Sequence, residues 1–96
     1  MSKQQELTHE EYLENLHNTD KKYVLKFWAE WCVPCKRYNT VVDDVANQSE
    51  IPFYTVNVDR EPKLVELFKV KGIPLTVVIH GNMIKGIHSG AIEKIS

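Results

Sequence analysis

The segment Trp31-Cys32-Val33-Pro34-Cys35 contains both cysteines of this 96-residue chain. It follows residues 23–29, an apolar and aromatic run that is typical of a strand. It precedes apolar residues that recur at helical spacing, namely Tyr38, Val41, Val42, Val45 and Ala46. The Cys-x-x-Cys pair is therefore expected at the junction between a strand and a helix.

Cys32 is expected at or just before the first turn of that helix. Unpaired backbone N–H groups and the positive end of the helix dipole favour a thiolate there, so we expect a lowered pKa for the Cys32 thiol. Pro34 suits this turn because its fixed φ is helical and its missing N–H would have had no partner. Cys35, one helical turn later, can close a small disulfide with Cys32.

Three interpretations of the cysteine pair compete. A structural disulfide is disfavoured because its stabilising effect grows with the length of the closed loop, and this loop is very short. A zinc site would need two more ligands, and the histidines form no His-x3–5-His pair; they are His9, His17, His80 and His88. A redox-active dithiol fits the strand, the helix, the proline and the number of cysteines.

Composition sets limits on the other function classes. A chain of 96 residues with 43% hydrophobic content is long enough for one domain, residues 1–96, with a real core. The net charge of −1 gives no electrostatic basis for binding nucleic acid or a membrane surface. No segment has the length of a membrane span, and the polar N-terminus lacks the apolar core of a signal peptide. We therefore expect a cytoplasmic protein, in which two cysteines are more plausibly catalytic than structural.

The rest of the sequence predicts an α/β fold. A capping box of Thr8 and Glu11 begins a first helix, and a second strand follows at residues 53–58. Another helix is expected from Pro62 to Gly72, and residues 75–79 and 83–87 predict a hairpin with its turn at residues 81–82. These elements predict a three-layer α/β/α architecture with a central mixed sheet of four or five strands, in which the N-terminus supplies at most a short edge strand.

Residues 27–36, Phe-Trp-Ala-Glu-Trp-Cys-Val-Pro-Cys-Lys, resemble the active-site segment of the thioredoxin family. The resemblance extends to Asn57-Val58-Asp59, to Gly72-Ile73-Pro74 and to Gly90, so it covers nearly all of the chain beyond residue 22. It implies the thioredoxin-like fold. The C-terminal helix of that fold would be shortened or absent, because the few residues after Gly90 allow a single helical turn at most.

The resemblance also implies a thiol-disulfide oxidoreductase that reduces protein disulfides. Cys32, nearer the helix end and more exposed, would attack, and Cys35 would resolve the mixed disulfide. A thioredoxin reductase-type flavoprotein would restore the dithiol of this electron carrier. The chain has no glycine-rich nucleotide-binding fingerprint, so we expect no bound cofactor. We also expect that the protein holds no metal and is a monomer. The alternative is a thioredoxin-fold binding module, or processivity-type adaptor, whose dithiol is secondary.

The family carries a cis-proline at the position of Pro74, beside the dithiol. The resemblance then implies that the backbone of Ile73 lies open at the rim of the site and can pair with an extended substrate segment. Val33 departs from the family, which usually has a glycine between the cysteines. The implied substrate-binding residues are Trp31, Val33, Pro34, Ile73, Pro74 and Gly90.

Lys26 interrupts the apolar strand and is a candidate modulator of the cysteine pKa values. In the family the matching position usually carries a buried aspartate, and a lysine usually stands at the place of Thr55. Two interpretations of Lys26 remain open. Its methylenes can pass along apolar neighbours while the ammonium stays in water, or its amine can lie beneath the dithiol, where partial burial would lower its pKa.

Overall fold

The computed structural model describes residues 4–94. Its described part contains one mixed sheet of five strands, in the order β1-β3-β2-β4-β5. Strands β1, β3 and β2 are parallel, and β4 is antiparallel to both β2 and β5. The predicted edge strand at the N-terminus is β1. The strands are β1 (Gln4–Glu6), β2 (Lys22–Trp28), β3 (Phe53–Asn57), β4 (Gly72–His80) and β5 (Met83–Lys94).

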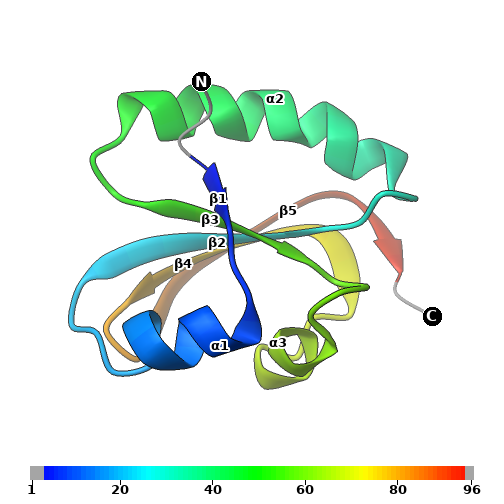
Figure 1. Ribbon diagram of the computed structural model, residues 1–96. Helices are drawn as coiled ribbons and strands as arrows, with labels where there is room; N and C mark the ends of the chain where they lie inside the picture. Colours follow the sequence, from blue (N-terminus) through cyan, green and yellow to red (C-terminus); the bar gives the residue numbers. More distant parts are fainter. Residues whose placement is uncertain (1–3, 95–96) are drawn as a thin grey trace.

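Helices cover both faces of this sheet, which confirms the predicted three-layer architecture (Figure 1). Helix α1 (His9–Glu11) continues into the π-helical turn η1 (Tyr12–Leu16) and lies, with α3 (Pro62–Leu67), on the face opposite α2 (Val33–Gln48). The capping box is present: the Glu11 N–H donates to the Thr8 hydroxyl at 3.1 Å, and the Thr8 N–H donates to the Glu11 carboxylate at 3.2 Å. Within residues 4–94, no helix has both the length and the apolar character that crossing a membrane requires.

The alternation of side chains along the strands divides the core into two clusters. One cluster packs the sheet against η1 and α3 and includes Leu25, Phe27, Val56, Val77, Leu16 and Leu64. The other packs the sheet against α2 and includes Val24, Phe53, Val42 and Ala46. Because Lys26 lies two residues after Val24 on β2, it points to the α2 face.

The helix that begins at Pro62 ends earlier than predicted. We expected Gly72 to terminate it, but α3 ends at Leu67 and Gly72 is the first residue of β4. Lys69 adopts a left-handed φ of 55°, and the N–H groups of Lys69 and Val70 bond to the carbonyls of Glu66 and Val65. This is the Schellman arrangement, which usually uses glycine at the left-handed position. Because lysine occupies the position where glycine is usual, the sequence did not indicate that the helix ends here.

The C-terminal segment also differs from the prediction. Residues 91–94 belong to β5 and form no helical turn, and the remaining residues of the predicted turn lie outside the described part. Glu93 of β5 pairs with Ile73 of β4, and Ser89 pairs with Leu75. The three residues of β5 between Ser89 and Glu93 therefore lie opposite Pro74 alone. The structure confirms that no C-terminal helix covers the sheet within residues 4–94. Continued pairing with β4 replaces it.

Candidate redox site

The two cysteines lie where β2 leads into α2. Cys32 is the N-cap residue of α2, and its Sγ accepts a hydrogen bond from the Cys35 N–H at 3.2 Å. Pro34 occupies the first turn, where a proline loses no hydrogen bond. The two cysteines form a disulfide with their Cα atoms 5.3 Å apart. The sequence therefore placed the pair correctly at a helix N-terminus.

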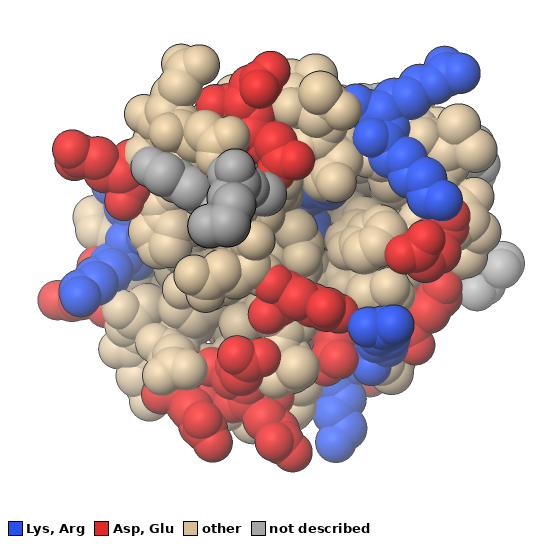
Figure 2. Space-filling view, turned by 45° about the horizontal axis from the view of Figure 1, so that its top comes forward, with Lys and Arg blue, Asp and Glu red and all other residues tan. Residues whose placement is uncertain are grey.

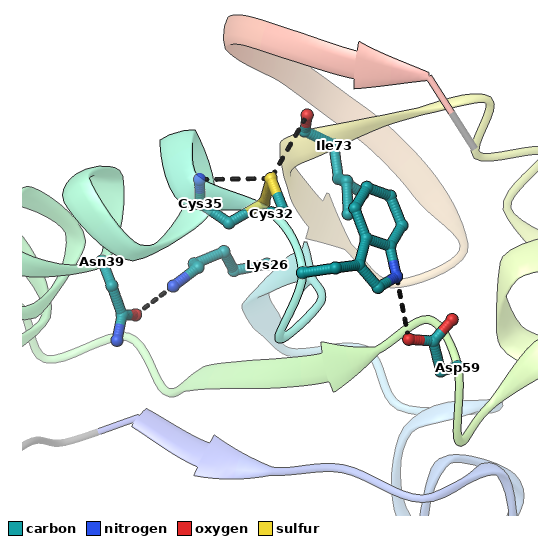
Figure 3. Close-up of a disulfide and its surroundings, with 7 residues drawn as sticks. Lys26, Cys32, Cys35, Asn39, Asp59 and Ile73 are labelled. Atoms are coloured by element: carbon teal, nitrogen blue, oxygen red, sulfur yellow. Dashed lines mark hydrogen bonds between the residues drawn. A yellow bond between two sulfur atoms is a disulfide. The ribbon is translucent and has the colours of Figure 1, made fainter.

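Neither cysteine is accessible to solvent in this oxidised form. Cys32 and Cys35 are both 0% exposed, so the expectation that Cys32 is the more exposed of the two is wrong. The Ile73 carbonyl oxygen lies 3.9 Å from Cys32 Sγ (Figure 3). Ile73 is itself 0% exposed and is paired with Glu93 of β5. The expectation that its backbone lies open at the rim of the site is therefore wrong for this oxidised form. The position at the helix end, rather than exposure, distinguishes Cys32.

The implied substrate-binding residues lie on both sides of the disulfide. Trp31 is 49% exposed, and its Nε1 donates to the Asp59 carboxylate at 3.0 Å (Figure 3). Val33 is also exposed, and Pro34 is half-buried. The peptide bond between Ile73 and Pro74 is cis, as the resemblance implied. The backbone of Gly90 lies in the part of β5 opposite Pro74.

The Asp59 contact is one that sequence reasoning missed. Asp59 follows β3 and belongs to the motif Asn57-Val58-Asp59, but its sequence gives no reason to pair it with Trp31. Its carboxylate accepts a hydrogen bond from the indole N–H and thereby fixes the orientation of the exposed ring beside the disulfide.

Lys26 lies beneath α2 and is 1% exposed, so the interpretation with its ammonium in water is wrong. The ammonium donates a hydrogen bond to Asn39 Oδ1 and is turned toward Asn39 rather than toward the two sulfur atoms (Figure 3). Burial lowers the pKa of Lys26 from its usual 10.5 to about 8, and the nearby Asp43 carboxylate partly opposes this change. The hydrogen bond to Asn39 places the titratable amine of Lys26 close to the turn of α2 that carries Cys35.

Two side chains of α2 and one of β1 complete this polar cluster. The Gln4 side-chain amide donates to Asn39 Oδ1 at 3.3 Å and also to the Asp43 carboxylate. Sequence reasoning singled out none of these three residues. The spacing of Cys35, Asn39 and Asp43, four residues apart, was the available signal, because such residues share one helix face.

Figure 2 shows one face of the molecule, which carries charged side chains of both signs. Basic side chains occur in small groups among acidic and uncharged ones on the face shown in Figure 2. Glu30 and Lys36, close to the disulfide, form an exposed ion pair at 3.6 Å. Within residues 4–94, no three His, Cys, Asp or Glu side chains are grouped so that they could hold a metal ion.

Comparison with known proteins identifies the family of this chain. The family model for thioredoxin matches residues 3–96. Thioredoxin of Buchnera aphidicola subsp. Schizaphis graminum is 28% identical, over 99% of this chain and 90% of the relative. Thioredoxin 1 of Nostoc sp. is 29% identical, over 98% of this chain and 90% of the relative.

A solved structure supports the fold independently. The thioredoxin of Malassezia sympodialis, Mala s 13, superposes with a TM-score of 0.83 at 23% identity, and the match covers 95% of this chain and 82% of that one. Family match, fold and a Cys32–Cys35 disulfide at a helix N-terminus agree with one another. The chain belongs to the thioredoxin family and is a thiol-disulfide oxidoreductase that acts on protein disulfides.

Proposed function

We propose that Cys32 is the attacking nucleophile and Cys35 the resolving thiol in the reduction of protein disulfides. The Cys32 thiolate attacks one sulfur of the substrate disulfide, forming a mixed disulfide and releasing one substrate thiolate. Cys35 then attacks Cys32 Sγ, which forms the Cys32–Cys35 disulfide and releases the second substrate thiolate. Two electrons pass to the substrate, and the two protons lost by the dithiol are taken up by the released thiolates.

The observation that carries this assignment is the hydrogen bond from the Cys35 N–H to Cys32 Sγ at the N-terminus of α2. An N–H donor bonds more strongly to an anionic acceptor than to a neutral one, and the helix dipole adds to this preference. Both effects favour the thiolate at Cys32. Cys35 lies inside the first turn, where it can reach Cys32 but is poorly placed to meet a substrate first.

For substrate docking we infer a surface around the disulfide formed by Trp31, Val33, Pro34, Ile73, Pro74 and Gly90. The exposed ring of Trp31 and the exposed side chain of Val33 support this inference, because both present apolar surface next to Cys32. The Ile73 carbonyl, 3.9 Å from Cys32 Sγ, would accept a backbone N–H of an extended substrate. Because Ile73 is buried here, docking would require a local opening.

We further propose that the protein acts in the cytoplasm as a monomer and is reduced again by a thioredoxin reductase-type flavoprotein. The relatives named thioredoxin support this partner class. Lys26 would raise the thiolate fraction of the dithiol, because a buried cation nearby favours an anion. This effect acts through space, since the Lys26 ammonium bonds to Asn39.

The test is reduction of insulin in the presence of dithiothreitol. We expect the wild-type chain to accelerate insulin precipitation strongly, and Cys32→Ser to reduce the rate to that of dithiothreitol alone. Cys35→Ser is the matched variant: it keeps the nucleophile and should accumulate a mixed disulfide with insulin that Cys32→Ser cannot form. Equal rates for the wild type and Cys32→Ser would refute the assignment and favour the adaptor alternative.

A further inference from the structure

The α2 face of the sheet contains a polar cluster in which Lys26 is buried and Gln4, Asn39 and Asp43 are half-buried. Lys26 from β2 and Gln4 from β1 both donate to Asn39 Oδ1, and Gln4 also donates to the Asp43 carboxylate. We propose that Asn39 and Asp43 are positioning residues that hold Lys26 charged beneath α2, so that its proton is linked to the redox state of the dithiol. This proposal rests on the proposed function in taking Cys32 and Cys35 as the redox pair.

The helix geometry brings this cluster close to the dithiol. Cys35, Asn39 and Asp43 follow one another at intervals of four residues on α2, so they share one face, with about 5–6 Å between successive Cβ atoms. Asn39 Oδ1 accepts from two donors of different strands, which fixes the amide and, through it, the Lys26 ammonium. The ammonium is thus fixed beside Asn39, which lies about one helical turn from Cys35 on α2.

Asp43 is the carboxylate that acts on Lys26. The residues paired with Lys26 on the neighbouring strands are Thr55 and Thr76, which carry no charge. Beyond Thr55, β1 carries Glu6, which is exposed and forms an ion pair with Arg60 at 3.2 Å. Beyond Thr76, β5 carries His88, which is exposed and stacks on Tyr38.

Tyr38 completes the set of titratable groups on this face. Tyr38 immediately precedes Asn39, and its hydroxyl accepts a hydrogen bond from Thr76 of β4 at 3.4 Å, so it points toward the sheet rather than toward Asp43. Neither Tyr38 nor His88 adds a carboxylate to this face. The Asp43 carboxylate accordingly opposes the effect of burial on Lys26.

Reduction changes the charge beside this cluster. The disulfide is neutral, whereas a reduced dithiol carries a thiolate above the pKa of its first thiol. A cation that favours this thiolate must be favoured by it to the same extent, because coupling between two sites is reciprocal. The Lys26 titration midpoint should therefore move to higher pH on reduction, because a nearby negative charge favours the protonated amine.

The first experiment follows the Lys26 side chain by NMR as pH is raised, in the oxidised and the reduced protein. We expect a higher midpoint in the reduced form. In the oxidised form, Asp43→Asn should lower the midpoint, whereas the matched control Asp44→Asn, which removes the same charge from an exposed position of α2, should lower it less. Equal midpoints in both redox states, or equal effects of the two aspartate variants, would overturn the proposal.

The second experiment measures thiolate absorbance of the reduced protein in a double-mutant cycle. Asp43→Asn should raise the midpoint of thiolate formation when Lys26 is present, because it weakens the charge of Lys26. In the Lys26→Met background it should lower that midpoint or leave it unchanged, because only the loss of a distant negative charge remains. The same shift in both backgrounds would overturn the proposal.

Insulin reduction by the wild type is assayed separately. Failure of that assay would refute the proposed function, whereas a Lys26 whose titration does not depend on the redox state would refute only this inference.

Discussion

Replacing Lys26 by methionine should change how the stability of the oxidised protein depends on pH. The folded state lowers the pKa of Lys26 from 10.5 to about 8, so the unfolded chain binds this proton more tightly. Stability rises with pH wherever the unfolded state binds more protons. The contribution of Lys26 is therefore least favourable below pH 8, and it improves as the pH rises from 8 to 10.5.

The magnitude follows from the two pKa values. The full change corresponds to about 3 kcal/mol, since each pKa unit is worth about 1.4 kcal/mol, and about 1.4 kcal/mol of it should be gained by pH 9. Loss of the hydrogen bond to Asn39 shifts the whole curve of Lys26→Met, and any change in that bond when Lys26 deprotonates is already contained in the folded-state pKa.

Urea unfolding of the oxidised wild type and of Lys26→Met at pH 7, 8 and 9 measures this difference. Titrations of other groups, such as the buried Tyr23, occur in both proteins and cancel in the comparison. We expect the wild type to gain about 1 to 1.5 kcal/mol relative to the variant between pH 7 and pH 9. A constant difference across this range would show that Lys26 titrates normally and that its burial does not lower its pKa.

Three further stability predictions follow from the described contacts, each measurable by urea unfolding. Thr8→Ala removes the N-cap of α1 and should cost about 1 kcal/mol, and no loss would mean that the capping box does not stabilise this short helix. Leu25→Ala, at a fully buried position, should cost about 2–5 kcal/mol, whereas Leu13→Ala, at a half-exposed one, should cost much less, and equal costs would contradict the assigned core. Gly81→Ala places a Cβ on a residue with φ of +66° and should cost about 1–2 kcal/mol, and an unchanged midpoint would contradict the assigned turn.

The elements that sequence reasoning found are those with strong local signals. The apolar run before Cys32 and the helical spacing after it predicted β2 and α2, and the Thr8 capping box predicted α1. Gly81 marked the hairpin turn between β4 and β5, and it has the positive φ that such a turn needs. Each of these signals comes from residues close together in the chain.

The errors came from features without a local signal. The end of α3 uses Lys69 where glycine is usual, and the strand at residues 91–94 forms because β4 offers it a partner, which composition cannot reveal. Burial of Lys26 was likewise undecided from sequence, because it depends on Asn39, thirteen residues away along the chain. Contacts between distant segments decided the last two, whereas the end of α3 is a local arrangement that uses an unusual residue.

The complete burial of Cys32 and Cys35 has a kinetic consequence. A thiol can attack a shielded disulfide only in the fraction of molecules that have opened, so the observed exchange rate is the intrinsic rate multiplied by that fraction. Each 1.4 kcal/mol of opening cost slows exchange about tenfold. A protein partner that binds Trp31 and replaces the lost contacts lowers this cost, whereas a small thiol cannot. We therefore expect the closed site to react faster with protein thiols than with small ones, and dithiothreitol to reduce it only through the opened fraction.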